Sequence, residues 1–204
     1  MTLEFDETTH TYWVDGRPVP SITQIVAPLG KDYDEPDDDH LEITIEAAAE
    51  RGTALHAYIA HRLNGGEAES FELPDDYAGY ADAADLFLSE HNIEPLLIET
   101  PLCCGEFAGT PDLVAELDGE TAIIDYKFVS ALAKSKVGAQ LGGYLELCVE
   151  NGIEPQKLAA VQFLRDGKYR FYRAQKNAAE SAFRACLELY RIKTAKHARG
   201  RIFE

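Results

Sequence analysis

The alternation of hydrophobic and polar positions predicts a β-hairpin near the start of the chain. Residues 11–20 alternate around Asp15-Gly16, a pair that is typical of a tight hairpin turn. Ser21 and Gln24 then form the pattern of a helix-capping box, which predicts a short helix after the hairpin.

Two longer helices are expected next. Residues 31–39 are acidic and contain a proline, and we interpret them as a solvated loop. Residues 41–63 are alanine-rich and have a helical pattern that Gly52 interrupts, and residues 77–91 predict a second helix.

The middle of the chain changes to a strand pattern. Residues 95–104, 107–117 and 121–128 are rich in β-branched and apolar side chains, with Asp118-Gly119 as a turn between the last two segments. These segments predict three core strands.

The last third combines both kinds of element. The pattern predicts a helix over 137–149 and strands over 158–164 and 168–174, joined by Asp166-Gly167. A last helix to about Ala198 begins at a capping box of Asn177 and Glu180. The whole order indicates a single α/β or α+β domain, in which helices flank a central sheet. A length of 204 residues fits one such domain.

The charge is distributed unevenly along the chain. With 36 acidic and 19 basic residues the formal net charge is −17, which on its own argues against a nucleic-acid partner. Residues 1–156 hold 32 acidic and 7 basic residues, whereas residues 157–204 hold 4 and 12, a net charge of +8. The basic last quarter is therefore suited to contact with DNA phosphates.

Composition limits the class of protein further. The chain has no run of eighteen apolar residues, and its start lacks the basic and apolar parts of a signal peptide, so we expect a cytoplasmic protein without a membrane partner. The four cysteines show neither C-x-x-C spacing nor a matching histidine pattern. They are expected to be buried free thiols.

One stretch brings two aspartates and a lysine close together in the sequence. Asp112 ends the segment Gly109-Thr-Pro-Asp112, and Asp125-Tyr-Lys127 follows. Asp125 and Lys127 are two positions apart in a predicted strand, so their side chains point to the same sheet face. Two carboxylates about 4 Å apart repel by roughly 4 kcal/mol at an effective dielectric near 20, and a divalent cation would relieve this repulsion. The alternative for Asp125 and Lys127 alone is ordinary charge alternation on an edge strand.

Two other pairs have helical spacing. Gln140 and Tyr144 share a helix face, so an amide and a hydroxyl can reach a phosphate or a base; the alternative is a packed tyrosine beside a surface glutamine. Gly52 precedes His56 by four positions, which leaves room for close approach of backbone or ligand, or else separates two helices with Thr53 capping the second. A core histidine is the competing interpretation of His56.

Four segments in this order resemble the PD-(D/E)XK nuclease superfamily, in particular its RecB-like branch with phage-type recombination exonucleases. The segments are Arg51-Gly-Thr-Ala-Leu-His56, Gly109-Thr-Pro-Asp112, Asp125-Tyr-Lys127 and Gln140-Leu-Gly-Gly-Tyr144. Together they span residues 51–144, about half of the chain. The resemblance implies a restriction-endonuclease-like core with a central mixed sheet in residues 41–204, and an N-terminal hairpin and helix extension with the acidic loop in residues 1–40.

The resemblance also implies a role for each residue of the site. The implied catalytic residues are Lys127, Asp112, Asp125, Gln140 and Tyr144. The implied ligands of a Mg²⁺ or Mn²⁺ ion are His56, Asp112, Asp125 and the backbone carbonyl of Tyr126. Glu99 is a looser match for a further carboxylate ligand, and a solvated strand residue is an equally good interpretation. No iron–sulfur cluster is expected, because the cysteine trio of cluster-bearing relatives is missing and Cys186 stands alone.

A DNA-binding surface is expected beside this site. Lys168, Arg170 and Tyr172 share one face of a predicted strand. The full set of residues expected to contact DNA is Arg51, Gln140, Tyr144, Lys168, Arg170 and Tyr172. Further basic residues follow in and beyond the terminal helix: Arg191, Lys193, Lys196, Arg199 and Arg201. Ordinary solvated charge is the alternative for each of them taken singly.

The implied function is that of a Mg²⁺- or Mn²⁺-dependent deoxyribonuclease, most simply a phage-type exonuclease that processes DNA ends for recombination or repair. Its setting would be the cytoplasm of a bacterium or a phage-infected cell. DNA would be its main partner, joined by a recombination or single-strand-binding protein. Two alternatives remain open: a structure-specific or restriction-like endonuclease with the same site, and a catalytically silent acidic DNA mimic or inhibitor on a nuclease fold.

Overall fold

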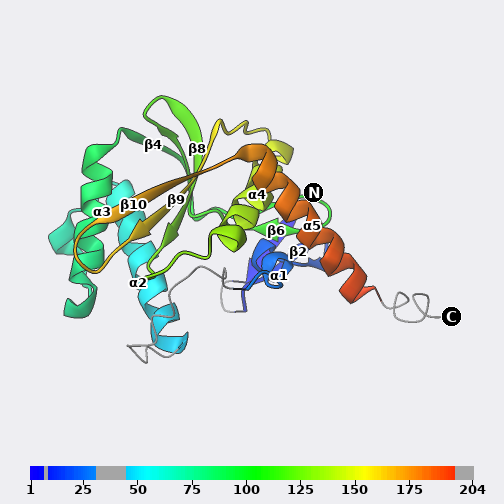
Figure 1. The fold of residues 1–204 in the computed structure, drawn as a ribbon, viewed down its shortest axis with the longest axis horizontal. Helices are drawn as coiled ribbons and strands as arrows, with labels where there is room; N and C mark the ends of the chain where they lie inside the picture. Colours follow the sequence, from blue (N-terminus) through cyan, green and yellow to red (C-terminus); the bar gives the residue numbers. More distant parts are fainter. Residues whose placement is uncertain (7–8, 31–44, 196–204) are drawn as a thin grey trace.

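The helices and strands are arranged around a five-stranded sheet (Figure 1), in a computed structural model that describes residues 1–6, 9–30 and 45–195. The strand order is β10-β9-β8-β7-β4. The bounds of these strands are β4 Ile93–Ile98, β7 Leu113–Leu117, β8 Glu120–Lys127, β9 Lys157–Phe163 and β10 Tyr169–Ala174. The sheet is mixed, because β8 and β9 pair in parallel and the other neighbours pair antiparallel.

Helices cover both faces of the sheet (Figure 1). The bounds are α2 Ile45–Leu63, α3 Ala78–Glu90, α4 Lys134–Glu150 and α5 Lys176–Thr194, with short 3₁₀ turns at Ala68–Ser70 and Asp75–Tyr77. Ile124 of β8 packs in the same hydrophobic cluster as Leu55 of α2, whereas the neighbouring Ile123 packs with Leu141 of α4. Both faces of β8 are therefore buried, which explains its nearly continuous run of apolar residues.

The N-terminal segment packs on the α4 side of the molecule. It contains β1 (Leu3–Asp6), β2 (Thr11–Val14) and β3 (Arg17–Val19) in one sheet, and then α1 (Ile22–Val26). The capping box that begins α1 is formed as predicted, since Ser21 Oγ accepts from Gln24 N at 3.1 Å and Gln24 Oε1 accepts from Ser21 N at 3.0 Å.

The predicted strands 95–104 and 107–117 are each broken in two. Besides β4 and β7 they contain β5 (Leu102–Cys103) and β6 (Ala108–Gly109), which pair with each other in a separate small sheet. Glu99 directly follows the last residue of β4, and its backbone φ of +44° lies in the left-handed region. Pro111 lies between β6 and β7 and has no N–H to donate to a ladder, so the strand does not continue through it.

The helices differ from the predictions in two further respects, the continuity of α2 and the ends of α5. Helix α2 runs through Gly52 without a break, so this glycine does not divide two helices. A Cβ added at Gly52 would meet no atom within 4 Å, so the glycine does not make room for a neighbouring backbone either. The predicted capping box at Asn177 is wrong, because α5 already begins at Lys176, after Gln175. The helix ends at Thr194 rather than Ala198.

The acidic segment 31–39 and the predicted start of α2 at Leu41 lie outside the described residues, as do Lys196, Arg199 and Arg201. Within the part of the chain that the structure describes, we find no helix with the length and apolar character needed to span a bilayer.

Two glycines of α4 provide a direct check of the close contact between α4 and α5. A Cβ on Gly142 would lie 2.1 Å from the backbone oxygen of Ala179, whereas one on Gly138 would meet nothing within 4 Å. Gly142→Ala is therefore expected to lower the free energy of unfolding by about 2–3 kcal/mol. Gly138→Ala should instead raise it by up to about 1 kcal/mol, because alanine has the higher helix propensity. Urea unfolding of both variants measures the difference, and equal effects would contradict the described contact.

Candidate metal and catalytic centre

Chemically active side chains meet at one end of the main sheet, where β7 begins and β8 ends. The antiparallel register pairs Leu113 with Ile124, so Asp112 and Asp125 are the next residues along the two strands. Glu99 follows β4 at the same end, and its backbone N donates to the carbonyl oxygen of Asp112 at 3.1 Å. The sheet register thus brings together carboxylates that are far apart in the sequence.

His56 of α2 completes a compact group with Glu99 and Asp112. Its Nδ1 lies 2.9 Å from Glu99 Oε1 and 3.6 Å from Asp112 Oδ1. One potential ligand atom from each of the three residues lies within 4.8 Å of the other two, which is close enough for all three to hold one metal ion. The left-handed backbone of Glu99 is uncommon for a residue with a side chain, and such strain is frequent at functional sites.

Asp125 and Lys127 form a buried ion pair beside this group. Asp125 is completely buried, and its Oδ2 lies 2.5 Å from Lys127 Nζ. The prediction that the two side chains share a sheet face is therefore confirmed. Neither oxygen of Asp125 accepts a well-aligned hydrogen bond from the described residues, whereas Asp112 Oδ2 accepts one from the backbone N of Tyr126 at 2.6 Å.

The charges in the centre depend strongly on one another. Burial raises the pKa of both Asp112 and Asp125 above the ordinary range, although His56 and Lys127 oppose that shift. Burial disfavours the imidazolium form of His56, yet the nearby carboxylates of Asp112 and Glu99 raise its pKa to about 9. Lys127 likewise keeps a raised pKa despite its burial, because Asp125 and Asp112 favour the ammonium form. Three carboxylates thus surround two cationic side chains, and positive charge is strongly favoured here.

The donor set fits a hard divalent cation. Carboxylate oxygens dominate it, with one imidazole nitrogen, a combination suited to Mg²⁺ or Mn²⁺ and unlike the cysteine-rich sets of structural zinc sites. Glu99 belongs to the three-residue group, whereas Asp125 lies outside it and pairs with Lys127. Metal binding by Asp125 and by the Tyr126 carbonyl stays a prediction.

Gln140 and Tyr144 occupy one face of α4, as their spacing predicted. Gln140 Nε2 donates to the hydroxyl oxygen of Tyr144 at 2.9 Å, and only 4% of Tyr144 is exposed. Burial, together with the negative charges of Asp112 and Asp125, raises the pKa of Tyr144 well above its ordinary value. The hydroxyl therefore keeps its proton at neutral pH and can donate it in a hydrogen bond.

A buried glutamine that was not predicted holds the loop after Lys127. Gln162 of β9 is 1% exposed, and its Nε2 donates to the backbone oxygens of Val129 and Ser130 at 2.8 and 2.9 Å. Its Oε1 accepts from the hydroxyl of Tyr172 at 3.0 Å. A polar residue inside the apolar run 158–163 was the available sequence signal, because a buried amide needs partners.

Several residues expected to contact DNA have partners within the protein. Arg51 donates to the backbone oxygen of Phe128 at 3.0 Å and lies over the ring of Tyr80. Tyr172 is bonded to Gln162, as described above. Lys168 precedes β10 and pairs with Asp166 at 2.9 Å, so it lies in the turn rather than on the strand with Arg170. DNA contact by this set stays a prediction.

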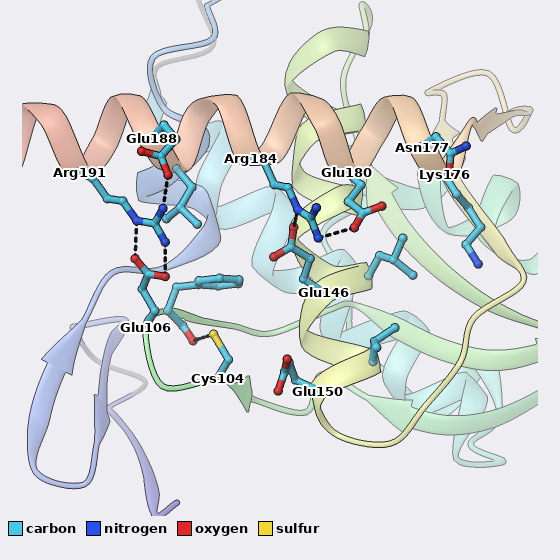
Figure 2. Close-up of a pocket in the computed structure, with 14 residues that line it drawn as sticks. Cys104, Glu106, Glu146, Glu150, Lys176, Asn177, Glu180, Arg184, Glu188 and Arg191 are labelled. Atoms are coloured by element: carbon cyan, nitrogen blue, oxygen red, sulfur yellow. Dashed lines mark hydrogen bonds and ion pairs between the residues drawn. The ribbon is translucent and has the colours of Figure 1, made fainter.

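Two of the four basic residues of α5, Arg184 and Arg191, pair with acidic neighbours (Figure 2). Arg184 pairs with Glu146 of α4 at 2.9 Å and with Glu180 at 2.6 Å. Arg191 binds Glu106, with its Nε 2.6 Å from Glu106 Oε1, and it also pairs with Glu188. These pairs line a cavity of about 640 Å³ between α4 and α5. The excess of basic residues in the sequence therefore does not translate into an equal excess of free positive charge on this helix.

Gln162 offers a test of how firmly the loop after β8 must be held. Gln162→Leu is expected to lower the free energy of unfolding by about 1–3 kcal/mol, because it removes three part-buried hydrogen bonds, two of them to the backbone of the loop and one to Tyr172. It should also slow any reaction that depends on Lys127, by about tenfold, since this loop follows Lys127 directly. Tyr172→Phe removes one of the three bonds and should show a smaller loss in urea unfolding. Equal stability of the wild type and Gln162→Leu would contradict this role.

Comparisons with known proteins give distant structural similarities. No family model and no curated protein sequence matches the chain significantly. Among solved structures, it is similar to a protein provisionally described as an exonuclease from Eubacterium rectale, with 12% identity and a TM-score of 0.48 over 82% of this chain and 79% of the other. An alkaline exonuclease from Laribacter hongkongensis matches with 14% identity and a TM-score of 0.39, over 91% and 95% of the two chains. A phage-related exonuclease from Haemophilus somnus matches with 12% identity and a TM-score of 0.38, over 84% and 93%. These similarities are too distant to transfer an activity to this chain.

Proposed function

We propose that the protein is a metal-dependent nuclease that hydrolyses DNA phosphodiester bonds. The observation that carries the proposal is the buried Asp125–Lys127 ion pair beside the compact group of His56, Glu99 and Asp112. One part of this centre offers ligands for a divalent cation, and the other offers a fixed ammonium group. Both functions favour hydrolysis of a phosphodiester, because negative charge develops on the phosphoryl oxygens while water attacks.

Each side chain has a distinct task in this proposal. His56, Glu99 and Asp112 would hold a Mg²⁺ or Mn²⁺ ion, which when bound supplies Lewis-acid polarisation and lowers the pKa of water. Asp125 holds the ammonium of Lys127 in place, 2.5 Å from its Oδ2. From that position Lys127 can orient the attacking water and stabilise charge on the phosphate.

Tyr144 and Gln140 would position the substrate. The amide of Gln140 donates to Tyr144 at 2.9 Å, which leaves the tyrosine proton free to bond a phosphate oxygen. Our preferred biological role is that of a phage-type exonuclease processing DNA ends for recombination or repair. The sequence resemblance supports this narrower role.

The proposal is tested by digestion of end-labelled single- and double-stranded DNA. We expect shortened products with Mg²⁺ or Mn²⁺ and none with EDTA. Covalently closed circular DNA separates the two nuclease forms, because an exonuclease leaves it intact and a structure-specific or restriction-like endonuclease cuts it. Cleavage that persists in EDTA would contradict the proposed use of a metal ion.

The acidic body of the chain favours one candidate from another class. With 32 acidic residues in positions 1–156, a nuclease fold without activity could act as a DNA mimic or inhibitor. The intact set of Asp112, Asp125 and Lys127 argues against such a loss of activity. A wild-type chain that cleaves no DNA with either metal, yet binds a DNA-binding protein in competition with DNA, would favour the mimic.

A further inference from the structure

A second cavity, of about 370 Å³, opens beside the candidate metal centre, between the N-terminal sheet and α4. It has the size of a small-molecule binding site. Two side chains of the centre also line it, namely Glu99, which bonds His56, and Tyr144, which bonds Gln140. A ligand whose phosphate lies at the centre can therefore extend directly into this cavity.

The described lining of the cavity offers neither lysine nor arginine to a second phosphate. Among the described residues that line the cavity there is no lysine or arginine, and the one carboxylate is Glu99. A second phosphate would therefore find no lysine or arginine to pair with in this lining. The cavity is therefore suited to an uncharged part of a substrate.

Aromatic side chains line part of the cavity. The rings of Phe5 and Tyr12 are stacked, with centroids 4.5 Å apart and an interplanar angle of 21°. His10, an exposed residue with a backbone φ of +49°, packs edge-on against Phe5 with centroids 6.0 Å apart. Aromatic walls of this kind bind nucleobases by stacking and tolerate any base sequence.

Hydroxyl groups also line the cavity. Thr110 Oγ1 and the Tyr12 hydroxyl share a hydrogen bond of 2.8 Å, and Ser21 and Thr23 add two further hydroxyls. Such groups can both donate and accept, which suits the oxygen atoms of a sugar and the polar edge of a base. Aromatic rings, several hydroxyls and the lack of lysine and arginine in the described lining together match a nucleoside.

We propose that this cavity binds the nucleoside part, the base and deoxyribose, of the nucleotide adjoining the phosphate that is cleaved. The assignment rests on the proposed nuclease function and adds to it a subsite built largely by the N-terminal segment. It explains why this segment packs against the centre. It also implies that the enzyme holds its substrate through a base as well as through the backbone.

A double-mutant cycle between the protein and the DNA tests this subsite. The substrate is an oligonucleotide with one abasic site, and the cleavage rate beside that site is compared with the rate in the intact sequence. The wild type is expected to cleave the intact position about tenfold faster or more, the range expected for the loss of one stacking contact. Phe5→Ala should cleave both substrates at the slower rate.

Phe171→Ala is the matched control, because Phe171 is another partly exposed strand aromatic but packs near Phe87 and His91, away from the centre. Phe171→Ala should keep the wild-type ratio of the cleavage rate at the intact position to the rate beside the abasic site. If Phe5→Ala does not fold, Thr23→Trp fills the cavity from an exposed position. It should likewise make the cleavage rates of the intact and the abasic substrate equal. A folded Phe5→Ala or Thr23→Trp variant that keeps the full wild-type ratio would overturn the subsite while leaving the nuclease function intact.

Failure of the proposed function gives a different result. If the wild type cleaves no DNA with either metal, ligand-observed NMR of the full chain with thymidine and deoxyadenosine still reports on the cavity. Nucleoside signals that persist in Phe171→Ala and vanish in Thr23→Trp would support the subsite without the nuclease. No signal in the wild type would overturn the subsite as well.

Discussion

Replacing Lys127 with methionine is expected to reduce the rate of DNA cleavage by at least about 10³-fold, since one side chain both orients water and stabilises phosphate charge. Methionine keeps the aliphatic stem but removes the ammonium that lies 2.5 Å from Asp125. DNA binding should persist, because the metal-ligand group of His56, Glu99 and Asp112 is unchanged. Single-turnover cleavage and a DNA-binding titration measure the two effects separately.

Stability provides the control for this variant. Loss of one partner from a buried ion pair costs about 3–5 kcal/mol, and protonation of Asp125 reduces this cost. Lys127→Met/Asp125→Asn should therefore recover much of the lost stability while remaining inactive.

Lys157→Met is the matched control for activity. It removes a lysine at the opposite end of the sheet, where Lys157 pairs with Glu120, and should retain activity. Metal-dependent cleavage at the wild-type rate by Lys127→Met would refute the role of Lys127.

Asp112→Asn is expected to weaken Mn²⁺ binding by at least about 100-fold, because it removes one charged ligand from the group of His56, Glu99 and Asp112. The asparagine oxygen can still accept the hydrogen bond that Tyr126 N makes at 2.6 Å, so the fold should remain. Calorimetric titration measures the affinity. A wild-type chain at 100 times the dissociation constant should gain about 2.7 kcal/mol in stability from Mn²⁺, and the variant should lose most of that gain.

An exposed aspartate gives the matched control for the metal measurement. Asp166 lies in a turn and pairs with Lys168, so Asp166→Asn removes the same charge from the chain without touching the centre. Its Mn²⁺ affinity should equal that of the wild type. Equal Mn²⁺ affinities in all three proteins would show that the ion binds elsewhere.

Local periodicity was sufficient to predict the parts of the site that lie on one element. Asp125 and Lys127 are paired because alternate residues of a strand share a face, and Gln140 contacts Tyr144 because residues four apart share a helix face. The hairpin at Asp15 follows equally from local turn chemistry. These features need no knowledge of distant contacts.

Contacts between elements could not be predicted in the same way. Glu99 reaches His56 because β4 has a register shift between Pro95 and Leu97 and is followed by a left-handed residue. Pro95 signals only an irregular strand, and the left-handed residue has no signature in the local sequence, so the solvated alternative for Glu99 was equally reasonable. The role of Gln162 likewise depends on the course of a loop that lies more than thirty residues earlier in the chain.

Charge counted along the sequence gave only part of the electrostatic picture. Residues 157–204 carry a net charge of +8, yet Arg184 and Arg191 each contact two carboxylates in the folded chain (Figure 2). Exposed pairs of this kind contribute little to stability, but they lower the free positive charge on α5. The local charge of the centre, where three carboxylates surround two cations, is the more informative feature.

The most direct test of the central claim compares single-turnover digestion of end-labelled DNA by the wild type, Asp112→Asn and Lys127→Met, each with Mn²⁺ and with EDTA. We expect cleavage by the wild type with Mn²⁺ alone, and at least about 10³-fold slower cleavage by both variants. Cleavage by the wild type in EDTA, or undiminished cleavage by both variants, would contradict the assignment of this cluster as the hydrolytic centre.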